Sequence, residues 1–234
     1  MRLIGVGVGP GDPELVTVKA VRVLRAADVV VVPVMSLDEE GRAERTVRAN
    51  TDRDVVRLVF ALDDRGGATA ARREAWDAAA DAVAQHTGTV AFATIGDPNI
   101  YSTFTYLADA VRERVPDVVV ETIPGITAMQ ELASRSGTVL CEGTESLALL
   151  PITAGIDAFD EALTHFDSVV AYKGGRHIAA LRDVLGKHDR LDQAVYGAAL
   201  GLAGEQVGEL PIDDAPYLST VLVPARRTTR GGKL

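Results

Sequence analysis

The chain has 234 residues, of which 47% are hydrophobic and 24% are charged, and its formal net charge is −9. This composition predicts a folded globular protein of one large or two small domains, and it excludes an intrinsically disordered chain. The acidic balance argues against nucleic acid as a partner, because nucleic-acid-binding surfaces are basic. The longest apolar run, residues 29–35, is far too short to cross a membrane, so we expect no membrane partner.

The start of the chain and its metal-binding residue types exclude further classes. Met1 is followed at once by a strand-like run, with no basic segment and no apolar signal core, so we expect a cytoplasmic protein. Cys141 is the only cysteine, which excludes an internal disulfide and a cysteine metal cluster. No histidine pairs with another histidine or with an acid at a zinc-like spacing, and we therefore expect no metal.

A glycine-rich turn follows the first expected strand, residues 2–8, and opens the first expected helix, residues 13–26. Its sequence, Gly-Val-Gly-Val-Gly-Pro-Gly-Asp-Pro, invites comparison with the dinucleotide fingerprint Gly-x-Gly-x-x-Gly. The spacing fails, because Pro10 or Asp12 stands where the third glycine is needed, and the next strand, residues 28–32, ends without an acid. We therefore disfavour a nicotinamide or flavin enzyme. The glycines instead indicate close approach of the backbone to a ligand or to a neighbouring strand.

A polar segment, residues 36–54, carries four arginines: Arg42, Arg45, Arg48 and Arg53. Two interpretations stay open. The segment is either a solvated loop with one or two helical turns, or a flap that supplies guanidinium groups to an anionic ligand. Beyond it we expect a strand at residues 55–60, a polar loop at residues 61–67 and an alanine-rich helix at residues 68–86.

A second turn, Gly96-Asp97-Pro98, lies between an apolar strand at residues 89–93 and a helix expected over residues 100–115. In an open parallel sheet, ligands bind at the carboxyl ends of the strands, where such turns lie. Asp97 is placed to cap the helix, and Pro98 suits its first position. The turn is therefore either a plain helix cap or part of a ligand site.

A third turn, Pro124-Gly125-Ile126-Thr127-Ala128, follows a strand at residues 118–123 and precedes a helix at residues 128–135. We place a domain boundary here, between residues 1–123 and residues 124–234. Before the boundary, strands and helices alternate as in a parallel α/β sheet.

After the boundary, the expected strands are residues 147–150, 168–172, 194–199, 206–210 and 218–223, and the expected helices are residues 158–165 and 177–185. The last two strands follow one another without a helix, which is typical of an antiparallel ending. We therefore predict an α/β fold with a mostly parallel N-terminal sheet and a mixed C-terminal sheet.

Together, in this order, the three turns resemble the tetrapyrrole methylase family, whose members use S-adenosylmethionine as methyl donor. Within that family, residues 96–107 and 141–151 are most similar to the precorrin-2 C20-methyltransferases of cobalamin biosynthesis. The resemblance covers nearly the whole chain up to Val223. It implies two α/β domains with the cofactor in the cleft between them, a homodimer, and C20-methylation of precorrin-2 to precorrin-3A.

Carried over residue by residue, the resemblance implies cofactor contacts in both halves of the chain: Pro10, Ile95, Gly96, Asp97, Ile100, Ser102, Thr103, Thr127, Ala128, Tyr172, Lys173, Ala198 and Ala199. Many relatives have methionine where this chain has Lys173. A lysine beside a sulfonium is unfavourable, so we expect this side chain to face substrate carboxylates. Because methyl transfer depends mostly on positioning, a base is needed only late, and its candidates are Asp97 and Tyr101. We expect Asp97 mainly to orient the cofactor.

The implied acceptor carries many carboxylates, which calls for arginine. The candidates are Arg42, Arg45, Arg48, Arg53 and Arg176, each of which is otherwise ordinary surface charge. Gly7 and Gly9 are expected to line the site, because only glycine lets a flat ring approach the backbone.

Several alternative functions stay open on the same fold. In one alternative the enzyme methylates another carbon of the precorrin ring. In another its substrate is the cobalt form of precorrin-2. A non-catalytic protein that binds S-adenosylmethionine is a different class. A methyltransferase for ribosomal RNA ribose is disfavoured, because the net charge is wrong for RNA.

Overall fold

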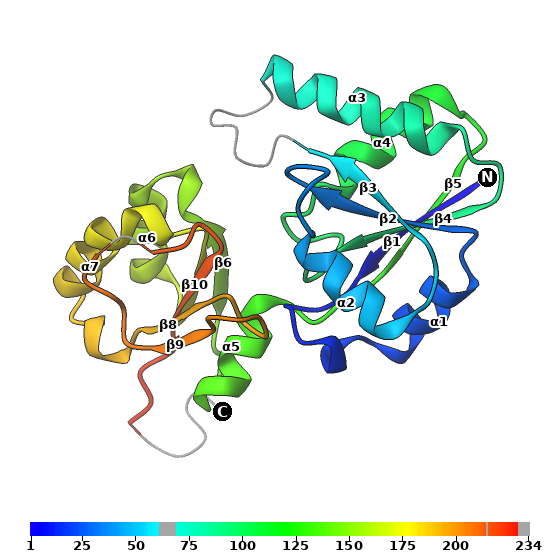
Figure 1. Ribbon diagram of the computed structural model, residues 1–234. Helices are drawn as coiled ribbons and strands as arrows, with labels where there is room; N and C mark the ends of the chain where they lie inside the picture. The colour runs from blue at the N-terminus through cyan, green and yellow to red at the C-terminus, as the bar shows by residue number, and fades with distance from the viewer. Residues whose placement is uncertain (61–68, 214, 229–234) are drawn as a thin grey trace. The chain divides into compact units, whose positions relative to one another are not determined.

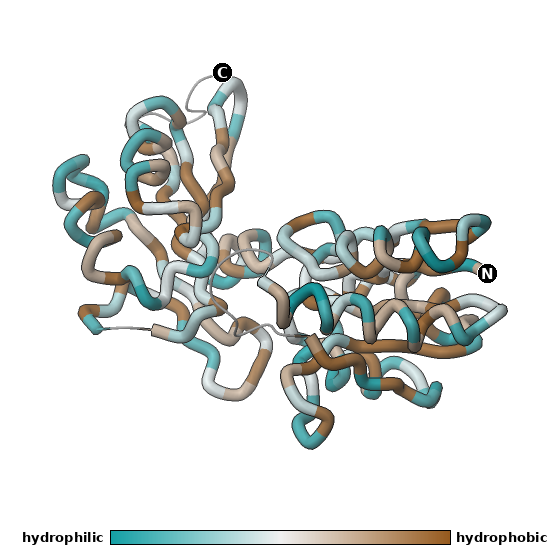
Figure 2. Tube along the Cα trace, turned by 90° about the horizontal axis from the view of Figure 1, so that it is seen from above, coloured by the Kyte–Doolittle hydropathy of each residue, from teal (hydrophilic) through white to brown (hydrophobic). Residues whose placement is uncertain are grey.

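The computed structural model describes residues 1–60, 69–213 and 215–228, and it divides into two compact units, Met1–Thr127 and Ala128–Leu234 (Figure 1). The polar loop expected at residues 61–67 lies outside the described residues. Every expected strand has a counterpart among the strands β1 to β10, displaced by no more than a few residues at either end. In each unit the hydrophobic segments gather inside and the hydrophilic ones lie mainly on the outer helices (Figure 2).

The first unit contains a five-stranded sheet in the order β3-β2-β4-β1-β5, with every neighbouring pair parallel. Its strands are β1 (Arg2–Gly7), β2 (Val29–Val34), β3 (Val55–Val59), β4 (Thr89–Thr94) and β5 (Val119–Ile123). The three central strands are buried along almost their whole length, as expected for a parallel sheet covered on both faces. The mostly parallel N-terminal sheet predicted from the sequence is therefore confirmed.

Helices cover both faces of this sheet (Figure 1). Alternate strand residues point to opposite faces, so Phe92 packs with α3 (Ala70–Ala84) and α4 (Phe104–Arg114). Its neighbours Ala91 and Ala93 pack with α1 (Val18–Ala26) and α2 (Arg42–Asn50) on the other face. The helices after β1 and β2 therefore cover one face, and those after β3 and β4 cover the other.

Two helices begin later than the sequence predicts. Residues 13–26 form a short 3₁₀ turn, Pro13–Leu15, and then α1, whose cap is the Thr17 side chain accepting the Ala20 N–H at 3.1 Å. The helix expected from residue 100 begins only at Phe104. The polar segment at residues 36–54, by contrast, contains a regular helix, α2, in place of one or two turns.

The second unit contains a five-stranded mixed sheet in the order β6-β7-β10-β8-β9. Its strands are β6 (Leu147–Pro151), β7 (Ser168–Tyr172), β8 (Val195–Ala198), β9 (Gln206–Gly208) and β10 (Ser219–Val223). Only β6 and β7 pair in parallel; β10 runs antiparallel to both of its neighbours, and β9 is antiparallel to β8. The mixed C-terminal sheet is therefore also confirmed.

One face of the second sheet packs against α6 (Ile156–His165) and α7 (Ile178–Lys187), which share a large apolar core with β7, β8 and β10. The other face packs against α5 (Ala128–Ser136). The contact is close, because a Cβ on Gly197 of β8 would lie only 2.6 Å from the buried Leu132 side chain of α5. The packing therefore fixes the start of α5 near the ends of these strands.

Candidate functional site

The carboxyl ends of β1 and β4 form a topological switch point. These strands are parallel neighbours, yet the chain leaves β1 for a helix on one face of the sheet and leaves β4 for a helix on the other. Connections that part in this way leave a crevice at the strand ends, which is the usual ligand site of an open α/β sheet. The first two turns identified in the sequence lie at this point, and the third follows the adjoining strand β5.

The three turns contact one another through their backbones. The Val8 N–H donates to the Thr94 carbonyl at 2.9 Å, and the Gly96 N–H donates to the Gly9 carbonyl at 2.7 Å. A Cβ on Gly7 would lie 2.5 Å from the Gly96 carbonyl oxygen, and one on Gly125 would lie 2.1 Å from it. Both distances are too short for any side chain. The glycines are therefore required by contacts within the protein itself, whatever ligand the turns bind.

Asp97 ties the second turn to the third. Its Oδ1 accepts the Asn99 N–H at 2.8 Å and its Oδ2 accepts the Gly125 N–H at 3.0 Å, and the residue is 8% exposed. The prediction that Asp97 caps the following helix is wrong, and so is the placement of Pro98 at its first position, because α4 begins at Phe104. The acid instead binds a glycine backbone group that is distant in sequence.

Ser102, and not Asp97, accepts the first backbone N–H of α4, whose N-cap residue is Thr103. The Ser102 Oγ accepts the Phe104 N–H at 3.2 Å and donates to the Thr94 Oγ1 at 3.0 Å. The side chain therefore links the end of β4 to the first turn of α4. Ile95, Gly96, Ile100 and Thr103, which the resemblance also implies as cofactor contacts, lie on the same connection between β4 and α4.

In the second unit, the ends of β7 and β8 flank the start of β10. Tyr172 pairs with Thr220, and Ala198 pairs with Ser219. The carboxyl ends of β7 and β8 therefore lie at the same end of the sheet, together with the predicted contacts Tyr172, Lys173, Ala198 and Ala199. The Tyr172 hydroxyl also accepts the Met129 N–H at 2.9 Å, which places the start of α5 at that end. The predicted contacts of this unit therefore lie together, as those of the first unit do.

Three predicted site residues have strained backbones. Among the described residues, the non-glycine residues with positive φ are Tyr101, Lys173, Asp189 and Ala199. The left-handed conformation costs a non-glycine residue about 1 kcal/mol or more, and such residues cluster at functional sites. Tyr101, at φ 51°, is 44% exposed, and burial of part of its ring raises the pKa of its phenol. The strain supports a site at these positions, and nothing in their residue types predicts it.

The structure adds Ser219, which the sequence did not suggest. The residue is 3% exposed, and its Oγ has no hydrogen-bond partner among the residues that the structure describes. Its carbonyl accepts the Lys173 N–H at 3.0 Å. A buried hydroxyl without a partner is rare in proteins and is a polar atom that a ligand can satisfy. In the sequence it is only the second residue of the strand expected at residues 218–223.

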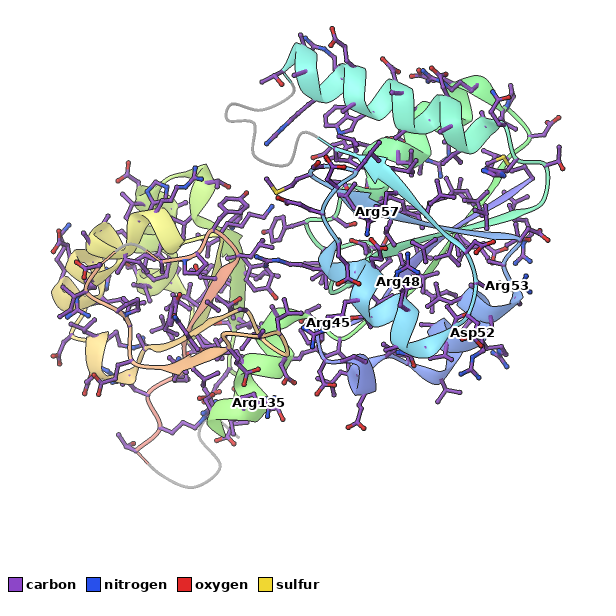
Figure 3. The ribbon with its side chains drawn as sticks, in the orientation of Figure 1. Arg45, Arg48, Asp52, Arg53, Arg57 and Arg135 are labelled. Carbon is purple, nitrogen blue, oxygen red and sulfur yellow. The ribbon has the colours of Figure 1, made fainter. Side chains whose placement is uncertain are left out.

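The candidate arginines separate into paired and unpaired groups. Figure 3 labels three of them, Arg45, Arg48 and Arg53. Arg48 donates to Glu44 at 2.7 Å, and Arg53 donates to the Arg25 carbonyl at 2.9 Å. Arg42 and Arg45 are exposed and have no hydrogen-bond or ion-pair partner within the described part of the chain. Arg176 lies 5.9 Å from the centre of the Tyr217 ring.

Two kinds of feature are absent from the described residues. No group of three or more histidine, cysteine or acidic side chains is arranged to hold a metal ion there. No helix in this part of the chain has the length and apolar character to span a membrane.

A family model of the Tetrapyrrole (Corrin/Porphyrin) Methylases matches residues 2–216. The chain belongs to this family. A precorrin-2 C(20)-methyltransferase from a Sinorhizobium species is 38% identical over 236 residues, which cover 95% of each chain. A cobalt-precorrin-2 C(20)-methyltransferase from Salmonella typhimurium is 29% identical, also over 95% of each chain. The family resemblance of the three turns is therefore confirmed.

The fold is confirmed by a solved structure. The uroporphyrin-III C-methyltransferase of Thermus thermophilus, described as a complex with S-adenosyl homocysteine, superposes with a TM-score of 0.67. The alignment covers 95% of this chain and 97% of that one at 20% sequence identity. At this identity the match supports the α/β fold with two sheets.

Proposed function

We propose that the protein is an S-adenosylmethionine-dependent methyltransferase that methylates C20 of precorrin-2 and forms precorrin-3A in cobalamin biosynthesis. The observation that carries the proposal is the 38% identity to a precorrin-2 C(20)-methyltransferase over nearly the whole of both chains. The convergence of three turns at a switch point supports it, because ligands of open α/β sheets bind at this end of the strands.

The residues present fit S-adenosylmethionine. The turns after β1, β4 and β5 place backbone amides and carbonyls at the strand ends of the first unit, and the second unit has the buried Ser219 hydroxyl, which has no partner among the described residues. When bound, this cofactor supplies an electrophilic methyl group on a sulfonium. We further propose that the cofactor contacts implied by the resemblance bind it, and that Asp97 acts by holding the second and third turns in place.

The chain's own residues would mostly position the reactants. Attack of an electron-rich ring carbon on the methyl group is an in-line displacement that gains chiefly from orientation. Afterwards the proton on C20 would pass to solvent water. Both Asp97 oxygens already accept backbone N–H groups, which suits a positioning role. A tyrosine phenol is protonated at neutral pH, and burial raises the pKa of Tyr101 further, so it would donate a hydrogen bond more readily than accept a proton.

The proposal is tested by incubating the purified protein with metal-free precorrin-2 and S-adenosylmethionine without oxygen. The expected result is a product heavier by one methyl group, placed at C20 by nuclear magnetic resonance. Methylation at another carbon would reassign the step. Binding of S-adenosylhomocysteine without turnover of any precorrin would refute the enzyme and leave a cofactor-binding protein.

Cobalt-precorrin-2 is the second candidate acceptor, favoured by the identity to the Salmonella typhimurium relative over 95% of both chains. Parallel assays with the metal-free and cobalt forms separate the two, and the form with the higher kcat/KM is the substrate. We also propose a homodimer located in the cytoplasm. Light scattering on a sizing column tests the dimer, and cell fractionation tests the location.

A further inference from the structure

A buried carboxylate organises the segment that follows β2. Glu44 is 0% exposed and accepts the Arg48 Nη2 at 2.7 Å and the Arg57 Nε at 2.7 Å. Burial alone would raise the pKa of Glu44, but the hydrogen bonds from Arg57, Arg48 and the Gly41 N–H outweigh it and lower that pKa. The carboxylate is therefore ionised and fully used inside the protein. Figure 3 labels Arg48 on α2 and Arg57, which belongs to β3.

The same network fixes the loop before α2. Arg57 also donates to the Leu37 carbonyl at 2.6 Å, so β3 holds both the loop and the helix. On its other side, α2 contacts the first glycine-rich turn. Thr46 donates to the Gly11 carbonyl at 3.4 Å, and Asn50 donates to the Pro13 carbonyl at 3.0 Å. The segment is therefore anchored to the site edge and is not a free flap.

The anchored segment leaves two kinds of side chain exposed. Met35 and Leu37 are 54% and 59% exposed, although apolar, and they directly follow β2 at the carboxyl edge of the sheet. Arg42 and Arg45 lie one turn apart at the start of α2 and have no partner among the described residues. Desolvation lowers the pKa of Arg42, which has no compensating partner in the described residues. The pKa of Arg57, by contrast, is raised by its hydrogen bond to Glu44. Exposed apolar groups followed along the same anchored segment by unpaired cations match a flat ring that carries carboxylates.

We propose that residues 35–45, here called the substrate arm, bind the tetrapyrrole. Arg42 and Arg45 bind its carboxylates, and Met35 and Leu37 contact its ring. Glu44 is a positioning residue that holds the arm through Arg57 and Arg48. Arg48 and Arg53 are thereby removed from the substrate candidates, because their guanidinium groups are used within the fold. This inference rests on the proposed function and names the residues that recognise its substrate.

The arginines are tested with Arg42→Ala and Arg45→Ala in the methyl-transfer assay. The matched control is Arg22→Ala, which removes an exposed charge without a partner in the described residues from the middle of α1. Each arm variant should raise the KM for precorrin-2 about tenfold, the worth of one charge-assisted contact. The Kd for S-adenosylhomocysteine, measured by calorimetry, should stay unchanged. An unchanged KM in both arm variants, or an equal rise in Arg22→Ala, would overturn the proposal.

The positioning role of Glu44 is tested by measuring KM and kcat separately for a Glu44 variant. Glu44→Gln keeps the shape of the side chain but removes the charge that holds the two guanidinium groups. A loss of folded protein alone would lower the apparent kcat and leave KM unchanged, so a raised KM indicates a displaced arm. Leu37→Ser, at an exposed position, gives a second test without a buried change, and it should also raise KM. Unchanged KM values in both variants would refute the arm.

Direct binding separates this inference from the proposed function. The probe is uroporphyrin III, a porphyrin ringed by carboxylates, followed by its visible absorbance. Binding that weakens in Arg42→Ala and Arg45→Ala but not in Arg22→Ala supports the arm, even for a protein that fails to methylate precorrin-2. Binding that is equal in all variants overturns the arm, even where wild-type methylation succeeds.

Discussion

Replacing Asp97 with asparagine tests whether this side chain holds two turns together. The two residues have the same shape, but asparagine offers one acceptor oxygen where aspartate offers two. In the native protein both oxygens accept backbone N–H groups, from Asn99 at 2.8 Å and from Gly125 at 3.0 Å. Whichever way the amide turns, its NH₂ group must face a backbone donor. One hydrogen bond is therefore lost, and the amide NH₂ is forced against a backbone N–H.

The expected cost follows from that geometry. A hydrogen bond to a charged group contributes about 1.5–3 kcal/mol, and Asp97 is almost fully buried, so Asp97→Asn should lower the free energy of unfolding by about 2 kcal/mol. Asp109→Asn is the matched control. It breaks the exposed pair with Arg112 on α4, and that pair contributes less than about 1 kcal/mol.

The assay uses the only tryptophan in the chain. Trp76 lies in the first unit and stacks on Tyr106 at 4.5 Å, so its fluorescence in a urea titration reports the unit that contains Asp97. This matters because two units can unfold separately, and a signal from both would not follow a two-state transition. S-adenosylhomocysteine binding is measured on the same variants.

Two results would refute the argument. Stability within about 0.5 kcal/mol of the wild type together with lost ligand binding would mean that Asp97 contacts the ligand directly and does not hold the turns. Unchanged stability and unchanged binding would mean that the two hydrogen bonds contribute nothing. The expected result is a loss of both, with the loss of binding caused by the displaced turns.

Three further predictions follow from the site and its surroundings. Gly125→Ala should destabilise the first unit by more than about 3 kcal/mol in the same urea titration, because its Cβ would lie 2.1 Å from the Gly96 carbonyl oxygen. A soluble variant of native stability would contradict this. Ser219→Ala should leave the free energy of unfolding unchanged, since its hydroxyl has no partner in the described residues. It should weaken S-adenosylhomocysteine binding about tenfold by calorimetry. Unchanged binding would remove Ser219 from the site. The hydrogen bond from His188 lowers the pKa of Asp160. The stability that the ionised acid contributes is therefore fully present above its ordinary pKa of about 4, and it is lost as the pH falls through the lowered pKa. Asp160→Asn should flatten that part of the acid unfolding curve, and an unaltered curve would exclude the contribution.

The strands and the fold class were predictable because their signals are local. Strands of a parallel sheet covered on both faces are continuous apolar runs, and β2 and β4 are almost entirely buried as such runs require. Glycine and proline end them, and these residues also mark the turns. The placement of the turns at one sheet edge follows from parallel topology alone, so their convergence could be expected once the strands were assigned.

The starts of helices were less predictable because short-range capping signals compete with long-range contacts. Asp97 followed by Pro98 is a good local signal for the start of a helix. In the structure the acid bonds to Gly125, which is 28 residues away, and the helix starts where Ser102 accepts its first backbone N–H. A serine near a helix start is common, so only the tertiary contact decides between the two residues.

Side-chain partners across the sheet could not be predicted at all. The four arginines of residues 36–54 look alike in the sequence, yet one faces a buried acid and two have no partner in the described residues. Arg48 is paired because Glu44 lies four residues earlier on the same helix, whereas the second partner of that acid, Arg57, lies on another element and was not among the candidates. The positive φ of Lys173 and Ala199 is equally hidden, since it results from the packing of strand ends and not from residue type.

The glycines show that a sequence pattern can predict the right site while the reason given for the pattern is only part of the explanation. In the sequence, Gly7 was interpreted as a place where a ring approaches the backbone. In the structure, the space that a Cβ would need is filled by Gly96 and Gly125 of the neighbouring turns. The glycine is therefore necessary even without a ligand, and loss of activity in a Gly7 variant would not indicate a ligand contact. Only variants that leave this backbone contact intact, such as Ser219→Ala and Arg45→Ala, can separate binding of the ligand from construction of the site.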